Sequence, residues 1–567
     1  MKQLLEKIIK DALDKAIANN YFIASEIPPI LLEIPKSNIF GDYTTNIAML
    51  IASRISKNPR EVANSIIKNI EDTSQLINKI EVAGPGFINI FINPKYWLAI
   101  LKEIEIKQEM FGSSDIGKGC KVHIEFVSAN PTGPLHVGHA RGAVVGDVLT
   151  NLLKTCGYTV LKEYYINDAG NQMKLLGLSC IVRYKQKLGQ DIPFLDNGYQ
   201  GEYIIDIAQD IIKKYGDKFI NIPENEVLPF FIEYTSNFIL NKIKFDLKRL
   251  GVTFDNWFSE TSLYKSGEVQ ETIERLKKEG YTYEKENAIW MKTSAFGDEK
   301  DRVIVRQNGE PTYYASDIAY HIKKFSQGFD IMINIWGADH HGYVNRIKAI
   351  IEVLGYAQSK LKVILIQLVN LLRGDQKVGM SKRAGEFHTL AEVLDEVGSD
   401  SIRFSFLTRR SDSHLDFDLE VAKKQSMENP VYYVQYAHAR ICSILEEAKK
   451  QDISLPLSSK EVALDLLILP EEVELNKLLS QFPDLVKTCT TTFEPHRLTF
   501  YLQELASHFH KYYNHHRIIS SKDEVIIIDE NLTQARLYFI AMIRVVLQNA
   551  LFLLGITPKE KMKKRCD

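Results

Sequence analysis

Two histidines spaced three residues apart, His136 and His139, enclose Val137 and Gly138 where a helical pattern begins. Residues three apart lie on one helical face, so both imidazoles should point the same way. The first turn of a helix offers unpaired N–H groups to phosphate oxygens, and Gly138 would let a flat base approach the backbone. The tetrapeptide therefore indicates a nucleotide site in which histidines donate to phosphate. A capping histidine beside a core histidine, or a pair of metal ligands, would give the same pattern.

A second candidate element is the glycine-bounded segment 379–385, which contains Met380, Ser381 and Lys382. Glycines at both ends allow the segment to move, and Lys382 and Arg383 place cations on it. A lysine carried by a moving loop can neutralise the charge that develops on a departing pyrophosphate. A solvated basic turn is the alternative interpretation.

Acidic side chains form the third candidate group. Glu125 lies at the end of an expected strand, and Tyr313 and Asp317, four residues apart, would share a helical face. Asp339 follows another expected strand, and open α/β sheets bind ligands at such strand ends. Acids beside an anion site need a reason, and a substrate with a cationic side chain would be one. Asp317 could instead be an ordinary helix-face charge, and the two histidines after Asp339 could bind a metal.

Length and charge limit the kind of protein that carries these groups. A chain of 567 residues exceeds one hydrophobic core, and at ~150 residues per domain it should contain three or four. Seventy Lys+Arg against 72 Asp+Glu give a formal net charge of −2, so a nucleic-acid surface would have to be a local patch. No apolar run approaches the roughly 18 residues of a membrane span, and the six cysteines contain no C-x-x-C pair. We expect a cytoplasmic, multidomain enzyme that does not enter a membrane.

The elements that would position the candidate residues follow an α/β order. Residues 121–127 alternate like a strand, residues 128–134 contain two prolines and a glycine as a loop does, and a helical pattern starts near Leu135. Residues 329–336 and 361–372 are further apolar strand candidates. The last region is almost wholly helical, which is typical of a bundle. The predicted ranges are 1–112, 118–375 with a more helical insertion at about 191–257, 376–428, and 429–567.

The segment Ser128-Ala-Asn-Pro-Thr-Gly-Pro-Leu-His-Val-Gly-His-Ala-Arg-Gly142 resembles the HIGH signature of class I aminoacyl-tRNA synthetases. Its Ser-Ala-Asn-Pro start is similar to that of the arginyl-tRNA synthetases in particular. Several ordered segments are far more specific than one tetrapeptide. The other segments that resemble this family are Phe40-Gly-Asp-Tyr-Thr-Thr-Asn46, Tyr165-Ile-Asn-Asp-Ala-Gly-Asn171, Trp336-Gly-Ala-Asp-His-His-Gly-Tyr343 and Asn429-Pro-Val-Tyr-Tyr-Val-Gln-Tyr-Ala-His-Ala-Arg440.

The resemblance implies a fold and an activity. The catalytic domain would be a Rossmann-type parallel sheet with a helical insertion, preceded by an α+β module that contacts the tRNA elbow and followed by an all-α anticodon-binding bundle. ATP with Mg²⁺ would activate L-arginine, and the arginyl group would pass to the terminal 2′-hydroxyl of tRNA(Arg). A monomer without a structural metal is expected. Family members commonly need bound tRNA before they activate arginine, which we carry over as a hypothesis.

The resemblance also implies roles for the residues that match the family's motifs. His136 and His139 match the HIGH histidines, which contact ATP phosphates, and Lys382 completes the catalytic set. Asp317 is expected to bind the guanidinium, because a carboxylate pairs with that planar group bidentately, which a lysine cannot reproduce. The complete expected sets are His136, Gly138, His139, Met380, Ser381 and Lys382 for ATP; Glu125, Asn130, Tyr313, Asp317 and Asp339 for arginine; and Asn46, Tyr433, Tyr436 and Arg440 for tRNA.

One position departs from the family pattern. The second signature of the family is K-M-S-K-S, whereas this chain has Gly379-Met-Ser-Lys-Arg383, which keeps Lys382 and lacks the first lysine. Arginyl enzymes often have a degenerate form of this motif. Two other classes stay open: a catalytically silent tRNA-binding paralogue, and a metal-dependent hydrolase. The ligands of the hydrolase would be His136, His139, Asp339, His340 and His341.

Overall fold

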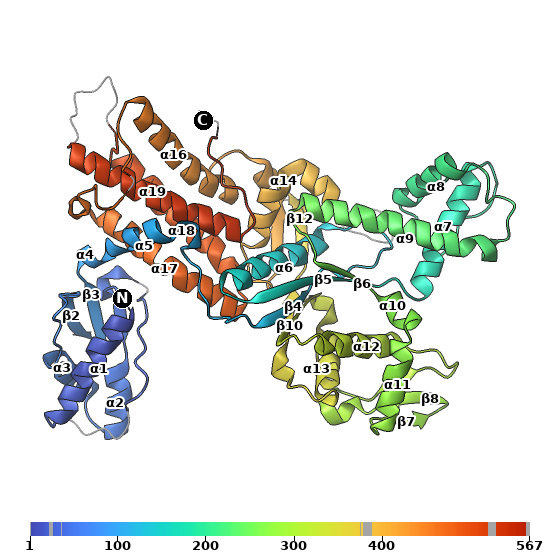
Figure 1. The fold of residues 1–567 in the computed structure, drawn as a ribbon, viewed down its shortest axis with the longest axis horizontal. Coiled ribbons are helices and arrows are strands. Elements are labelled where there is room, and N and C mark those ends of the chain that lie inside the picture. Colours follow the sequence, from blue (N-terminus) through green and yellow to red (C-terminus); the bar gives the residue numbers. More distant parts are fainter. Residues whose placement is uncertain are drawn as a thin grey trace. The chain divides into compact units, whose positions relative to one another are not determined.

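The structure, a computed structural model, describes residues 2–21, 27–35, 37–374, 376–377, 388–456, 458–519 and 529–562 (Figure 1). The chain divides into two compact units. The first unit comprises Met1–Gln108, Glu447–Ser480 and Lys511–Ile543, and the second comprises Glu109–Glu446, Gln481–His510 and Arg544–Asp567. Every candidate site residue that the structure describes, apart from Asn46, belongs to the second unit.

The N-terminal part of the first unit is an α+β module. Its sheet has the strand order β1-β3-β2, and both pairs are antiparallel. The first helix buries Leu5, Ile9 and Leu13 in the core of the module, because these residues recur at helical spacing. The elements are α1 (Lys2–Ala18), β1 (Tyr43–Thr45), α2 (Ile47–Ile55), α3 (Pro59–Lys68), β2 (Ile77–Ala83), β3 (Phe87–Ile92), α4 (Pro94–Trp97) and α5 (Ala99–Lys107).

The second unit is built on a five-stranded sheet in the order β11-β10-β4-β5-β6 (Figure 1). All neighbouring strands are parallel, which confirms the predicted α/β class. Val122, Ile124 and Met332 are fully buried, as expected of a parallel sheet covered on both faces. The elements are β4 (Lys121–Glu125), α6 (Val137–Thr155), β5 (Thr159–Ile166), β6 (Asn256–Ser259), β10 (Ile331–Gly337), α13 (Val344–Val353) and β11 (Leu361–Ile366).

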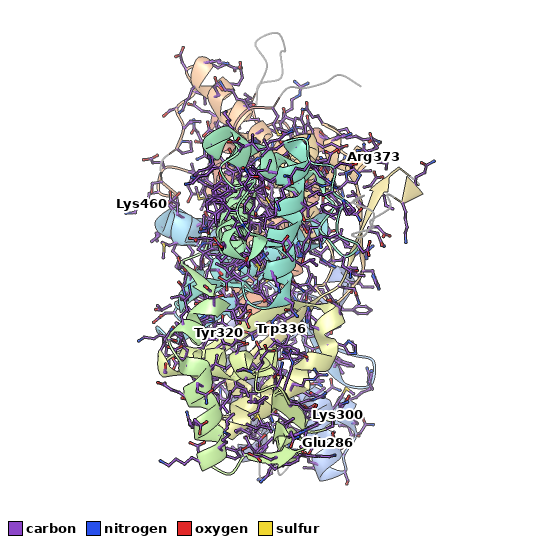
Figure 2. All side chains as sticks on the ribbon, turned by 90° about the vertical axis from the view of Figure 1, so that its right-hand side faces the viewer. Glu286, Lys300, Tyr320, Trp336, Arg373 and Lys460 are labelled. Atoms are coloured by element: carbon purple, nitrogen blue, oxygen red, sulfur yellow. The ribbon has the colours of Figure 1, made fainter. Side chains whose placement is uncertain are left out.

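Two excursions interrupt the parallel sheet. Between β5 and β6, α7 packs against α8 and α9, and Gly177 allows a close approach because a Cβ there would lie 2.6 Å from Ile232. Between β6 and β10 the chain forms a small antiparallel sheet, β7-β8-β9, whose first turn carries the exposed Glu286 (Figure 2). The elements are α7 (Asn171–Lys187), α8 (Glu202–Tyr215), α9 (Glu224–Arg249), α10 (Glu260–Lys265), α11 (Glu268–Lys278), β7 (Thr282–Lys285), β8 (Ala288–Met291), β9 (Arg302–Val305) and α12 (Tyr313–Ser326).

The apolar stretch 361–372, which the sequence indicates as one strand, forms two strands in different sheets. β11 ends at Ile366, and β12 (Val369–Arg373) pairs in parallel with β14 (Leu415–Asp418) and antiparallel with β13 (Gln376–Lys377). The backbone N–H of Gln367 turns away to donate to the Ser411 carbonyl at 2.8 Å. A continuous apolar run does not show where a chain changes sheets, since most residues of both strands are half-buried or buried. The helices that accompany β14 are α14 (Leu390–Phe406) and α15 (Leu419–Lys423).

The C-terminal region is helical, as its sequence pattern predicts. Among the helices that the structure describes, only α19 is long and apolar enough to cross a membrane by composition. Within its most apolar window 78% is buried inside the protein, which is the behaviour of a core helix. The helices are α16 (Pro430–Lys450), α17 (Pro470–Thr492), α18 (His496–His515) and α19 (Glu530–Leu553).

Candidate active site

The carboxyl ends of the parallel strands form the edge at which the candidate residues collect. β4 lies at the centre of the sheet; the chain continues to β5 on one side, and β10 returns on the other. Open α/β sheets bind ligands where the strand order reverses in this way. Glu125 is the last residue of β4 and pairs in register with Asn334 of β10. The candidate site therefore lies beside the ends of β4 and β10.

The two signature histidines lie next to each other at the N-terminus of α6. Nδ1 of His136 accepts the Gly138 N–H at 3.1 Å, and Nδ1 of His139 accepts the His136 N–H at 3.3 Å. The two rings stack with their centroids 3.7 Å apart. Because each Nδ1 acts as an acceptor, each neutral ring carries its proton on Nε2. This end of the helix thus combines two imidazole N–H groups with the positive end of the helix dipole.

The structure adds a local role for this tetrapeptide. His136 is the N-cap residue of α6, and the pair forms a reciprocal capping box, so His136 lies just before the first turn rather than within it. Gly138 gives the His136 ring its place, since a Cβ at that position would lie 3.0 Å from two ring atoms. The capping interpretation of His136 is therefore correct, and the cap uses Nδ1 of the ring.

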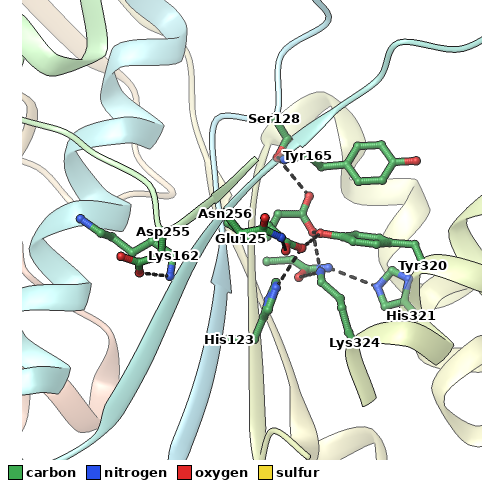
Figure 3. A network of polar contacts seen from close by, with 12 residues as sticks. His123, Glu125, Ser128, Lys162, Tyr165, Asp255, Asn256, Tyr320, His321 and Lys324 are labelled. Atoms are coloured by element: carbon green, nitrogen blue, oxygen red, sulfur yellow. Dashed lines mark hydrogen bonds and ion pairs between the residues drawn. The ribbon is translucent and has the colours of Figure 1, made fainter. Parts of the chain in front are cut away.

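Glu125 is a buried carboxylate with a cation already beside it (Figure 3). Lys324 Nζ lies 2.6 Å from its Oε2, the Tyr320 hydroxyl oxygen lies 3.3 Å from the same oxygen, and Ser128 Oγ donates to Oε1 at 3.2 Å. Burial alone would raise the pKa of Glu125, but the charge and hydrogen bond of Lys324 hold it below the usual value. Glu125 is therefore ionised and fixed in orientation.

A second buried acid supports the first one. Glu163, on β5, accepts hydrogen bonds from His123 Nε2 at 3.0 Å, from the Tyr320 hydroxyl at 2.5 Å and from the Asn256 amide. Burial opposes ionisation, but the hydrogen bonds from His123 and Tyr320 lower the pKa of Glu163 to about 2. The hydroxyl group of Tyr320 therefore lies between Glu125, at the end of β4, and Glu163, within β5.

Asp317, on α12, is an acid of this site whose pKa is raised rather than lowered. Tyr343 donates a hydrogen bond to its Oδ2. Burial, opposed by the Tyr343 hydrogen bond and reinforced by the charges of Glu260 and Glu125, raises the pKa of Asp317 to about 7. A cation bound at Asp317 would reverse this shift, because an opposite charge favours the ionised form.

Besides Glu163 and His123, sequence reasoning missed four residues of this site, and a signal for two of those four was present. Tyr320 and Lys324 continue the helical face that starts with Tyr313 and Asp317, at spacings of seven and eleven residues. Glu260 is buried beside this face and accepts a hydrogen bond from Ser316 at 2.7 Å. Its position directly after β6 would have indicated it, had that strand been recognised. The fourth is Tyr343, described above.

The other predicted arginine ligands lie nearer the surface. Tyr313 is 61% exposed at the start of α12, with its ring 6.4 Å from that of Tyr343. Asn130, in the loop after β4, donates to Gln172 at 2.7 Å. The exposed Asp339 follows β10, and its carboxylate lies 3.7 Å from His340. The structure thus brings Glu125 and Asp317 together and leaves Asp339 outside their network.

Met380, Ser381 and Lys382 lie outside the described residues. The described part of the chain resumes at His388, beside the N-terminus of α6. Thr389 forms an antiparallel bridge with His136, and the Leu390 N–H donates to the Leu135 carbonyl at 2.8 Å. Thr389 and Leu390, the start of α14, are therefore held beside the residue that caps α6.

The predicted tRNA contacts divide between the two units. Asn46 is the half-buried N-cap residue of α2 in the first unit. In the second unit, Tyr433 and Tyr436 on α16 pack around His510 at centroid distances of 4.8 and 5.8 Å. Arg440 lies over the Tyr436 ring at 4.6 Å and 3.2 Å from His510 Nδ1. These three α16 residues form one half-buried aromatic and cationic cluster with His510.

The metal-hydrolase alternative requires convergent ligands, and the structure contradicts it. Within the described part of the chain, no three His, Cys, Asp or Glu side chains are grouped as potential metal ligands. All five residues that this alternative needs are described. His136 and His139 use Nδ1 for the helix N-terminus, and His340 and Asp339 are exposed beyond β10.

Three family models match the chain in order along its length. They are an arginyl tRNA synthetase N terminal domain over residues 3–92, the catalytic domain of tRNA synthetases class I (R) over residues 102–414, and a DALR anticodon binding domain over residues 434–562. The parallel sheet, the histidine-capped helix and these matches define a class I aminoacyl-tRNA synthetase.

Known relatives narrow this class. The chain is 50% identical to the arginine–tRNA ligase of Syntrophotalea carbinolica over 562 residues, which covers 99% of this chain and 100% of that protein. A crystal structure described as a putative arginyl-tRNA synthetase from Campylobacter jejuni has 36% identity and a TM-score of 0.75, and covers 83% of this chain and 100% of that chain. The Thermus thermophilus arginyl-tRNA synthetase shares the fold, with 22% identity, a TM-score of 0.73, and coverage of 99% and 100%. The chain belongs to the arginyl-tRNA synthetase family.

Proposed function

We propose that this chain is an arginine–tRNA ligase, which activates L-arginine with ATP and transfers the arginyl group to the terminal 2′-hydroxyl of tRNA(Arg). One observation carries the proposal. Strand β4 ends at Glu125 and is followed by the N-terminus of α6 with His136 and His139, and the charge of Glu125 contributes to the raised pKa of Asp317. A site for anionic phosphate thus adjoins a site for a cationic side chain. MgATP and arginine carry those two charges.

Arginine binds with its guanidinium at Asp317, where the two oxygens of the carboxylate match the planar pair of N–H donors. Binding converts Asp317 to its ionised form, which burial disfavours. Asn130 and Glu125 hold the α-amino end, and Tyr313 and Asp339 lie toward the solvent. Selectivity follows from hydrogen-bond matching, because an amino acid without the guanidinium leaves Asp317 unpaired.

Activation is an in-line displacement at the α-phosphorus of ATP. A carboxylate oxygen of arginine attacks that phosphorus, the bond to the bridging oxygen of the β-phosphate breaks, and pyrophosphate leaves. His136 and His139 donate from Nε2 to the phosphate oxygens, and Gly138 keeps the backbone open to the adenosine. Met380, Ser381 and Lys382 approach the pyrophosphate, with Lys382 neutralising its charge. Mg²⁺ accompanies the triphosphate and offsets part of its charge.

Transfer uses the activated carbonyl. The 2′-hydroxyl oxygen of the terminal adenosine attacks the arginyl carbonyl carbon, the bond to the adenylate phosphate breaks, and AMP leaves with the two electrons of that bond. The hydroxyl proton passes to the released phosphate or to water. Asp317 keeps the arginyl side chain in place during this second step, which fixes the carbonyl relative to the incoming hydroxyl.

The remaining parts of the chain bind tRNA. Asn46 contacts the tRNA elbow from the module at 1–112, and Tyr433, Tyr436 and Arg440 stack on and pair with unpaired bases of the anticodon region from 429–567. The catalytic domain at 118–375, its insertion at about 191–257 and the connecting region at 376–428 complete the arrangement. The enzyme acts as a cytoplasmic monomer.

The test is aminoacylation of bulk tRNA with each of the twenty amino acids, followed by ATP–pyrophosphate exchange with and without tRNA. We expect charging with arginine alone, and arginine-dependent exchange when tRNA is present. Exchange with another amino acid but not with arginine would overturn the proposal. Arginine-dependent exchange without tRNA would leave the ligase activity in place and refute only the hypothesis that tRNA must bind first.

A further inference from the structure

Lys324 is an internal cation inside a site proposed for a cationic substrate. Its side chain is 2% exposed, and its Nζ lies 2.6 Å from Glu125 Oε2 and 3.2 Å from Asn334 Oδ1. The Tyr320 ring lies 4.2 Å from the same nitrogen (Figure 3). Three elements, β4, β10 and α12, therefore meet at one ammonium group. A buried lysine is costly unless it is paired in this way, so its presence needs a reason.

The contacts of Lys324 restrain one oxygen of Glu125, while a strained turn restrains the other. Val127 and Ser128 adopt φ angles of 68° and 41°, in the left-handed region that non-glycine residues rarely enter. This turn carries Ser128 Oγ back to Glu125 Oε1 at 3.2 Å. Backbone strain of this kind persists where the surrounding structure requires a particular geometry. The carboxylate plane is thus held from both sides.

Lys324 also decides the charge at this position. The titratable groups that face Glu125 are Tyr320, His321 and Asp317 on α12, His123 on its own strand β4, and Glu163 and Tyr165 on β5. Burial lowers the pKa of His123 and, to about 3, that of His321, so both imidazoles are neutral. Among the described residues around Glu125, Lys324 is therefore the cation that balances it.

We propose that Lys324 is a positioning residue for arginine: its ammonium holds Glu125 ionised and oriented, and by pairing with Glu125 it leaves Asp317 as the acid that receives the guanidinium. The two acids thereby take different tasks. Glu125, whose charge is already balanced by Lys324, orients the α-amino end of the substrate. Among the described side chains Asp317 has no such partner, and its negative charge pairs with the guanidinium. This inference rests on the proposed function, because it names a further residue for the same substrate.

The first experiment replaces Lys324 with methionine, which keeps the length of the side chain and removes its charge. Without a cation, the buried Glu125 takes up a proton and loses its orientation. We expect the KM for arginine in tRNA-supplemented exchange to rise about 30-fold, with kcat and the KM for ATP within about threefold of wild type. The matched control is Lys323→Met, because Lys323 is the neighbouring lysine and pairs with Glu268 at a half-buried position. An unchanged KM for arginine in a folded Lys324→Met enzyme would overturn the proposal.

A double-mutant cycle separates positioning from simple structural support. Lys324→Met is introduced into a Glu125→Gln background, where the pair is replaced by two uncharged side chains of similar size that should fold even if the single variant does not. We expect the KM for arginine to differ less than twofold between Glu125→Gln and the double variant, because Lys324 acts through Glu125. A further loss of more than fivefold would overturn the proposal. Wild-type exchange with arginine is measured first: its absence refutes the proposed function, whereas the two variant results bear on Lys324 alone.

Discussion

The site around Glu125 and the N-terminus of α6 both lie at the carboxyl end of β4. They differ in whether the residues that build them are close together or far apart in the sequence. The two Nδ1 atoms that fix the rings of His136 and His139 accept N–H groups from within the same four residues. The Glu125 site instead combines side chains from β4, β5, β10 and α12, and its ion pair joins residues 199 positions apart. The first is a local device for phosphate, which any helix N-terminus can supply. The second requires the completed fold, because its charges are stable only inside a matched network.

Replacing Asp317 with asparagine should have the largest effect, and the effect should be on arginine and not on ATP. The substitution keeps the size of the side chain and removes the charge that receives the guanidinium. We expect kcat/KM for arginine to fall about 1000-fold, with the KM for ATP within about threefold of wild type. Steady-state exchange kinetics measure both values. Glu310→Gln, an exposed acid just before α12, is the control, and an equal loss for both substrates would contradict a separate arginine site.

Substitutions of His136 and His139 at the N-terminus of α6 should lower kcat and leave arginine binding unchanged. In His136→Asn and in His139→Asn the amide can still approach the α6 N-terminus but lacks the imidazole Nε2. We expect kcat to fall about 100-fold in each, with little change in the KM for arginine, because the donors act on the transition state. Single-turnover formation of arginyl-adenylate measures the effect. His414→Asn, at an exposed position, should behave as wild type; a rise in the arginine KM of the signature variants would show that the two regions are not separable.

The pH dependence of arginine binding tests whether Asp317 serves arginine alone. Burial raises the pKa of Asp317 to about 7, whereas the guanidinium keeps its proton. Below that pH a proton must leave Asp317 before arginine binds, so the KM for arginine should fall roughly tenfold as the pH rises from about 6 to about 8. The KM for ATP should not follow this curve. A flat arginine profile, or the same profile in Asp317→Asn, would exclude Asp317 as the titrating group.

Substitutions in the α16 cluster should have the smallest kinetic effect of those considered. They should change neither arginine binding at Asp317 nor the chemistry at the N-terminus of α6. Arg440 lies over Tyr436 and beside His510, far along the chain from both signatures. We expect Arg440→Met to raise the KM for tRNA about fivefold and to leave the KM for arginine unchanged. Aminoacylation at varied tRNA concentration measures this, with Lys449→Met, an exposed residue of the same helix, as control. A change in arginine KM alone would assign Arg440 a different role.

The sequence predicted the local parts of this protein well. The strand, loop and helix from Lys121 to the HIGH segment are present, as is the face of α12 that carries Tyr313 and Asp317. The stretch 361–372 was predicted wrongly as one strand, because its apolar run continues through the turn at Gln367. The turn is set by Ser411, which lies elsewhere in the chain.

The residue order by itself determined the family, the parallel α/β class and the identity of the chemical groups, because these depend on short segments whose hydrogen bonds are local or whose periodicity repeats. Only the tertiary structure decided how the acids share their charges. Lys324 lies beside Glu125, Tyr320 bridges Glu125 and Glu163, and Tyr343 reaches Asp317, all across long separations in the chain. Ionisation in a protein interior depends on burial and on neighbours in space, and neither can be derived from spacing along the chain.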